Sequence, residues 1–110
     1  MKKIAVFLFE GAELFEIASF TDIFGWNNIV GLKEFRDIKV ETISYKESIK
    51  CTWGGKIKVE KVITEENIGK LFDYDILVIP GGFGKANFFE GKNNEIFKKL
   101  IKYFSENNKI

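Results

Sequence analysis

Apolar and polar positions alternate between two kinds of pattern along the chain. Residues 3–9 and 75–79, which are apolar after the leading Lys3 and Asp75, predict strands that are buried on both faces. Residues 38–44 combine β-forming side chains with an apolar-polar alternation, which predicts a third strand. Two short β-prone runs surround Gly54 and Gly55 within residues 49–59, a pattern typical of a hairpin or a bulge.

Helical spacing separates these strands. Apolar positions at intervals of three and four residues, together with capping signals such as Thr64, predict helices over residues 13–25, 64–70, 85–89 and 94–105. Residues 26–35 are expected to form a loop or a short turn. The first helix carries apolar side chains on more than one side, so we expect it to contact the sheet and also a second surface, such as another subunit.

The order of these elements predicts the fold class. Strands that alternate with helices indicate an α/β domain with a mostly parallel sheet and helices on both faces. Function in such sheets gathers beyond the carboxyl ends of the strands. Residues 10–16 and 80–84 occupy that position. Buried strands and broad apolar helix faces need more cover than 110 residues supply, so the fold is expected to be incomplete at the C-terminus and to continue after Ile110.

Composition narrows the classes of function. Charged residues make up 30% of the chain with a formal net charge of +1, and no block of one sign suggests a nucleic-acid partner. The apolar run at the start is too short for a signal peptide or a membrane span. A single cysteine and no histidine argue against a disulfide and a zinc site, and favour a reducing, cytoplasmic location. No cofactor is expected.

Three acids stand near the end of the first strand. Glu13 is best explained as a first-turn acid that favours the helix dipole. Glu16 lies among apolar neighbours of the same helix, so its carboxyl group could be desolvated and able to donate a proton; the alternative is an ordinary helix-surface acid. Glu10 lies nearby, in the loop before the helix.

The Pro-Gly-Gly-Phe-Gly segment after the apolar run 75–79 is the second candidate. Gly81 and Gly82 could present bare N–H groups to an oxyanion, although such a sequence is more often a simple turn. Phe83 could line a pocket beside them or belong to the core, as could Phe88 and Phe89. Cys51 is interpreted as a small buried apolar residue, because the chain has no histidine to activate it.

The segments KKIAVFLFEGAELFEIASFTDIF, LFDYDILVIPGGFG and NNEIFKKLIKYFSENNKI occur in the same order as in ThiJ/PfpI proteins, which they resemble over nearly the whole chain. The resemblance implies a flavodoxin-like three-layer sandwich, related to class I glutamine amidotransferases. It places Glu16 on the family's helix-borne glutamate, which contacts a cysteine at a nucleophile elbow, and Gly82 on the glycine of the oxyanion hole. Glu13, Gly81 and Phe83 are then expected to lie against the substrate.

The same resemblance places the nucleophilic cysteine a few residues after Ile110, so the residue that corresponds to it is not expected in this chain. It implies a cysteine-dependent enzyme that acts on a small carbonyl or amide substrate, as a glyoxalase, deglycase or hydrolase, and that residues 1–110 alone are inactive. The alternatives are a ligand-sensing domain of a transcription regulator and a redox-responsive chaperone. The expected partner is a second copy of the chain or the missing C-terminal half.

Overall fold

The computed structural model describes residues 2–83 and 92–108. Its centre is a four-stranded parallel sheet in the order β5-β2-β1-β6, in which β1 spans Lys2–Phe7, β2 Ile38–Ser44, β5 Lys61–Val62 and β6 Ile76–Val78. The predicted α/β class and mostly parallel sheet are therefore confirmed, and the arrangement is flavodoxin-like.

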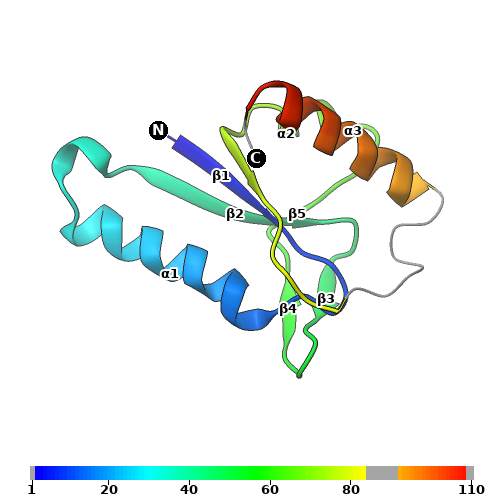
Figure 1. Ribbon diagram of the computed structural model, residues 1–110, viewed down its shortest axis with the longest axis horizontal. Coiled ribbons are helices and arrows are strands. Elements are labelled where there is room, and N and C mark those ends of the chain that lie inside the picture. Colours follow the sequence, from blue (N-terminus) through cyan, green and yellow to red (C-terminus); the bar gives the residue numbers. More distant parts are fainter. Residues whose placement is uncertain (1, 84–91, 109–110) are drawn as a thin grey trace.

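Two long helices lie on opposite sides of this sheet, as Figure 1 shows: α1 (Leu14–Val30) on one side and α3 (Lys92–Glu106) on the other. A short helix, α2 (Ile68–Leu71), precedes β6. Since successive side chains of a strand point to opposite faces of the sheet, the side chains of β1 divide between the two helices. Phe7 packs against Phe97 of α3, with ring centroids 5.1 Å apart.

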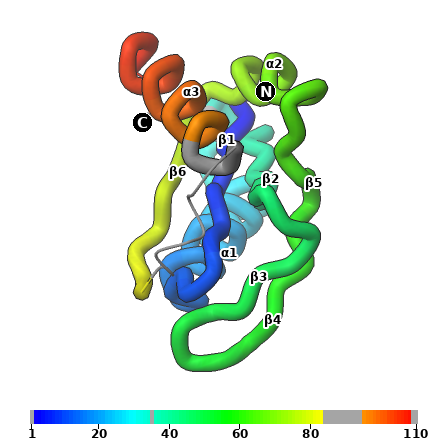
Figure 2. The backbone as a smooth tube through the Cα atoms, turned by 90° about the vertical axis from the view of Figure 1, so that its right-hand side faces the viewer, coloured from blue at the N-terminus to red at the C-terminus, as the bar shows by residue number. Residues whose placement is uncertain are grey.

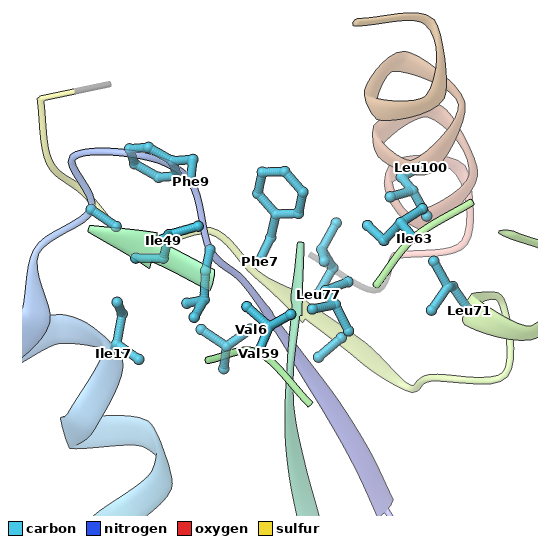
Figure 3. Packing of buried hydrophobic residues seen from close by; sticks show 14 of the residues in the cluster. Val6, Phe7, Phe9, Ile17, Ile49, Val59, Ile63, Leu71, Leu77 and Leu100 are labelled. Atoms are coloured by element: carbon cyan, nitrogen blue, oxygen red, sulfur yellow. The ribbon is translucent and has the colours of Figure 1, made fainter. Parts of the chain in front are cut away.

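The core fills both sides of β1. Four consecutive residues of this strand, from Ile4 to Phe7, are buried, which confirms the prediction of a strand covered on both faces. Figure 3 shows Ile17 of α1 on one side of the strand, and Leu100 of α3 near Ile63 and Leu71 on the other. This apolar run suits a central strand, because β1 lies between β2 and β6 in the sheet and has α1 on one face and α3 on the other.

The first helix is longer than predicted. The prediction ended it at Gly25, but α1 continues to Val30, and a 3₁₀ turn over Lys33–Phe35 follows. A mid-helix glycine costs about 1 kcal/mol relative to alanine. Fixed contacts at the end of the helix oppose that cost, because the side chain of Asn28 binds both the N–H and the carbonyl of Ile38 at 2.9 and 2.6 Å.

The prediction that residues 75–79 are buried on both faces is wrong for this chain. Leu77 is buried, but Ile76 and Ile79 are each 40% exposed. β6 lies at the edge of the sheet among the described strands, and α1 leans over β2 instead. An edge strand with one uncovered face cannot bury its whole apolar run.

The hairpin is confirmed. Strands β3 (Ser48–Lys50) and β4 (Lys56–Lys58) pair antiparallel, and Gly54 and Gly55 at its tip have φ values of 121° and 92°. The predicted helix over 64–70 forms only from Ile68, after a turn that Thr64 caps through reciprocal bonds with Asn67 of 3.2 and 2.8 Å. The predicted stretch over 85–89 lies outside the described residues, while the helix over 94–105 is confirmed as part of α3.

Candidate functional site

Three chain segments meet beyond the carboxyl ends of β1 and β6. These are the loop that joins β1 to α1, the loop that follows β6, and the β3–β4 hairpin, which extends past the same end of the sheet in Figure 2. An isolated antiparallel bridge joins Ala12 to Gly82, so the two loops touch directly. The structure thus brings together the two segments that the sequence singled out, residues 10–16 and 80–84, as far as Phe83.

Glu16 and Gly81 are in direct contact. Glu16 lies in the first turn of α1, and its Oε2 accepts a hydrogen bond of 3.1 Å from the N–H of Gly81. A Cβ atom on Gly81 would lie only 2.7 Å from that oxygen, so a side chain at this position would push the Glu16 carboxylate away from the Gly81 N–H. The desolvation expected for Glu16 is not found in this chain, because Glu16 is exposed and its neighbour Phe15 is 83% exposed.

Gly82 adopts a conformation that favours glycine. Its φ is 142°, and a Cβ at this position would collide with the carbonyl oxygen of Gly11 and lie 2.7 Å from the Cα of Ala12. Within the described parts of the chain, the Gly82 N–H has no hydrogen-bond acceptor. It can therefore donate to a bound group.

Glu13 takes part through its backbone. It is the N-cap residue of α1 without a side-chain cap bond, and its N–H donates to the carbonyl of Gly81 at 2.9 Å. Phe83 is not a core residue: it is 69% exposed and meets Trp53 of the hairpin edge to face, with centroids 6.0 Å apart. Phe88 and Phe89 lie outside the described residues.

Cys51 is buried, as predicted. Burial raises the pKa of its thiol, and the negative charges of Glu10 and Glu13 raise it further. A thiol with a raised pKa is a poor nucleophile. We therefore interpret Cys51 as a core residue. It borders a hollow of about 230 Å³ that is also lined by Glu10, Gly11, Lys50, Thr52 and Phe83.

Two polar side chains organise these loops, of which sequence reasoning noted Glu10 only as a nearby acid and missed Thr52 altogether. Glu10 accepts a hydrogen bond of 2.9 Å from the ammonium of Lys46 and is not part of the Glu16 cluster. The hydroxyl of Thr52 contacts the carbonyl of Gly11 and the N–H of Phe83, which lie 41 and 31 residues away along the chain. No local pattern marks either residue, because their partners come together only in the folded chain.

In residues 2–83 and 92–108, no group of three or more potential metal-ligating side chains comes together. Over the same residues, no helix has both the length and the apolar character that crossing a membrane requires.

Comparison with known proteins identifies a matching family and several solved structures that share this fold. The family model described as "DJ-1/PfpI family" matches residues 2–110. The chain superimposes on the "putative protease I" of Bacteroides thetaiotaomicron with a TM-score of 0.77 and 22% identity, over 100% of this chain and 60% of that one. No curated protein sequence matches at a significant level.

Two further solved structures share the fold at lower similarity. Drosophila melanogaster DJ-1beta matches with a TM-score of 0.69 and 22% identity, over 96% of this chain and 50% of that one. An AraC family transcriptional regulator from Pseudomonas putida matches with a TM-score of 0.68 and 12% identity, over 94% and 52%. The chain thus spans between half and 60% of the length of these proteins, and identities this low establish the fold alone.

Proposed function

Because the chain belongs to the DJ-1/PfpI family, we propose that it forms the N-terminal part of a single domain that acts as a cysteine-dependent enzyme on a small carbonyl or amide substrate. The match over about half of its solved relatives supports a longer domain. The nucleophilic cysteine then comes from a segment outside residues 1–110, since Cys51 is buried and its pKa is raised.

One observation carries this proposal. Two groups gather with the carboxylate of Glu16 at the carboxyl ends of β1 and β6: the N–H of Gly81, which binds it, and the N–H of Gly82, which has no acceptor among the described residues. An acid beside a backbone N–H donor suits attack of a thiolate on a carbonyl, because the acid can hydrogen-bond to the nucleophile while the N–H stabilises the negative charge that develops on oxygen.

The proposed roles follow from these positions. A thiolate attacks the substrate carbonyl, and the electron pair of the C=O bond moves onto its oxygen. The N–H of Gly82 donates a hydrogen bond to that oxyanion. Glu16, in its protonated form, donates a hydrogen bond to the thiolate and thereby stabilises it. Phe83 and the backbone near Gly81 and Glu13 form the side of the site on which the substrate rests.

Glu16 is exposed in this chain, so further protein must cover it to enclose the site. Two exposed apolar surfaces of the chain support such additional protein. The outer side of α1 exposes Phe15, Ile23, Trp26, Ile29 and Val30, which fits a second copy of the chain. Ile76 of the edge strand β6 and Ile79 just after it are exposed, and α3 carries a groove that includes Phe97 and Ile101. We assign this second surface to the rest of the domain.

The test compares residues 1–110 with the same protein continued through the segment that carries the cysteine. We expect the 110 residues alone to leave a 2-oxoaldehyde or a simple amide unchanged, and the continued protein to convert one of them. Glu16→Ala removes the proposed hydrogen bond to the thiolate and should lower kcat by about 100-fold, since a hydrogen bond to a charged group contributes about 1.5–3 kcal/mol. Glu95→Ala, which truncates a first-turn acid of α3 away from the site, should leave kcat unchanged.

Two results contradict the proposal. Full activity of residues 1–110 alone would show that no further nucleophile is needed, and a Glu16→Ala protein as active as the wild type would remove Glu16 from the reaction.

The second candidate function is ligand sensing without turnover, as a domain of a transcription regulator. The fold shared with the Pseudomonas putida AraC family regulator favours it. Saturable binding of a small molecule by the continued protein, with no chemical conversion and with a basic DNA-binding segment downstream, would support the sensor over the enzyme.

A further inference from the structure

Thr52 lies where the three segments of the site meet. Its backbone N–H donates to the carbonyl of Ala12 at 3.1 Å, and the neighbouring Lys50 carbonyl accepts a bond of 2.9 Å from the N–H of Gly11. These bonds fasten the hairpin to the loop between β1 and α1. Its side chain reaches the other loop, because Thr52 Oγ1 accepts a hydrogen bond of 3.3 Å from the N–H of Phe83.

The hydroxyl takes the place of a missing backbone bond. In an antiparallel bridge such as Ala12–Gly82, bonds between the flanking residues close both sides. On one side, the N–H of Glu13 donates to the carbonyl of Gly81 at 2.9 Å. On the other, the Phe83 N–H donates to Thr52 Oγ1, and the same hydroxyl donates to the carbonyl of Gly11. Thr52 therefore relays the bond that would otherwise join Phe83 directly to Gly11.

This relay fixes the residue between the two bonds. Gly82 has Gly81 held on one side and Phe83 held on the other, and its own N–H has no acceptor within the described residues. The Gly82 N–H shares a peptide plane with the Gly81 carbonyl that Glu13 binds, and the Phe83 N–H held by Thr52 belongs to the next plane, so the two bonds together hold the backbone on both sides of Gly82. The ring of Phe83 also meets Trp53, the residue after Thr52, so the hairpin holds this loop by a ring contact as well.

We propose that Thr52 is a positioning residue that aims the Gly82 N–H at the oxyanion. This inference rests on the proposed function for its catalytic consequence, whereas the placement of the loop can be tested without any turnover. A donor displaced by as little as 1 Å can lose about 100-fold in rate. Preformed donors contribute because they need no reorientation during the reaction.

The first experiment uses NMR on the 110-residue chain and compares Thr52→Val with Thr52→Ser. Valine keeps the branched shape and removes the hydroxyl, so we expect a more negative amide temperature coefficient for Phe83, a shifted Gly82 amide resonance, and weaker nuclear Overhauser effects between the Trp53 and Phe83 rings. Serine should restore the wild-type values. Thr42→Val is the matched control, because Thr42 Oγ1 accepts a hydrogen bond of 3.0 Å from the Glu60 N–H away from the site.

The second experiment measures kinetics in the protein that carries the nucleophile. Thr52→Val should lower kcat about tenfold, a partial version of losing an oxyanion donor, while KM changes less than about twofold. Thr52→Ser should recover most of kcat. A merely structural role would instead lower the active fraction and the unfolding midpoint without rescue by serine.

The two experiments separate the possible failures. Unchanged Phe83 and Gly82 resonances in Thr52→Val would overturn the positioning role whatever the protein does. Changed resonances with an unchanged kcat would overturn the link between Thr52 and the reaction. A wild-type protein without turnover would refute the proposed function, and the NMR result would still decide whether Thr52 holds the loop.

Discussion

The two long helices cover opposite faces of one sheet, and they use their apolar residues in opposite ways. α3 buries Ile96, Leu100 and Phe104 on a single face, and its other residues are polar or lie at the margin of the core. α1 has 17 residues, of which only Ile17 is buried, while Trp26 and Ile29 are 65% and 66% exposed. The sheet accounts for the apolar stripe of α3, but it leaves most of the apolar surface of α1 unexplained.

This difference separates two reasons for an apolar residue to occur in a helix. A stripe that repeats at helical spacing serves the core of the same chain. Apolar residues all around a helix indicate a second covered surface, and large exposed patches commonly mark sites of association. The four predictions below are ordered by decreasing expected effect: the first two test that division directly, and the other two test contacts at the start of α1 and on the α3 side of the sheet.

Leu100→Ala should destabilise the chain strongly. Leu100 is fully buried, so its truncation loses apolar burial and leaves a cavity, at a cost of about 2–5 kcal/mol. Ile29→Ala on the exposed side of α1 should change the free energy of unfolding of the monomer by less than about 0.5 kcal/mol. Urea unfolding at low protein concentration measures both. Similar losses would show that α1 is part of the core of the single chain.

Trp26→Glu should break the proposed association of two copies. A buried aromatic residue at an interface commonly contributes roughly 2 kcal/mol or more, so the dissociation constant should rise by about 30-fold or more. Sedimentation equilibrium of the variant and the wild type measures this change. Lys99→Glu, an exposed change on α3, is the control and should leave association intact. A wild-type chain that stays monomeric at high concentration would refute the pairing through α1.

Gly82→Ala should weaken the contact between the loop that precedes α1 and the loop that follows β6. The new Cβ would collide with the Gly11 carbonyl in a backbone conformation that costs a non-glycine residue roughly 1–3 kcal/mol. Gly69→Ala in α2 is the matched control, since no atom lies within 4 Å of its added Cβ, and it should be neutral or stabilising. Thermal unfolding of the two variants gives the comparison, and equal midpoints would contradict the close approach.

Tyr74→Phe should weaken the acid dependence of stability on the α3 side of the sheet. Burial alone would raise the pKa of Glu41, but the 2.8 Å bond from the Tyr74 hydroxyl and the nearby Lys61 and Lys39 outweigh it and lower that pKa below 4.5. The carboxylate therefore stabilises the fold above the pKa it has in the unfolded chain, and this contribution is lost as the pH falls through the lower, folded pKa.

In Tyr74→Phe we expect the free energy of unfolding to fall by on the order of 1 kcal/mol at neutral pH. The loss between about pH 5 and pH 3 should then be smaller than in the wild type, because less of the shift remains to be lost. Urea unfolding across this range measures both effects. Parallel stability curves for the two proteins would show that Tyr74 has no influence on Glu41.

Much of the fold could be predicted from the sequence, since the apolar pattern of residues 3–9 and of α3 indicates directly which side chains are buried. The end of α1 could not be predicted, because Gly25 is a typical helix-stop residue and the sequence does not show that Asn28, further along the helix, binds Ile38. The exposure of β6 was missed for a similar reason: a run of apolar residues describes what a strand can bury, whereas its position at the edge is set by the other strands.

The candidate site shows the same division. Glu16, Gly81 and Gly82 were expected at one end of the sheet because the topology of parallel strands places them there, and the family resemblance agrees. Thr52 was not expected, since its contacts depend on how the hairpin folds over two distant loops. The assigned chemical roles stay proposals, whereas the proximity of these residues is an observation.

The bond pair between Asn28 and Ile38 has a consequence for the order of assembly. Only ten residues separate the two partners, so this fastening of α1 to the start of β2 can form as soon as that short stretch has left the ribosome. Local contacts of this kind form faster than distant ones. The pair shortens the loop that must close before β2 can lie beside β1, which favours early pairing of these two strands during folding.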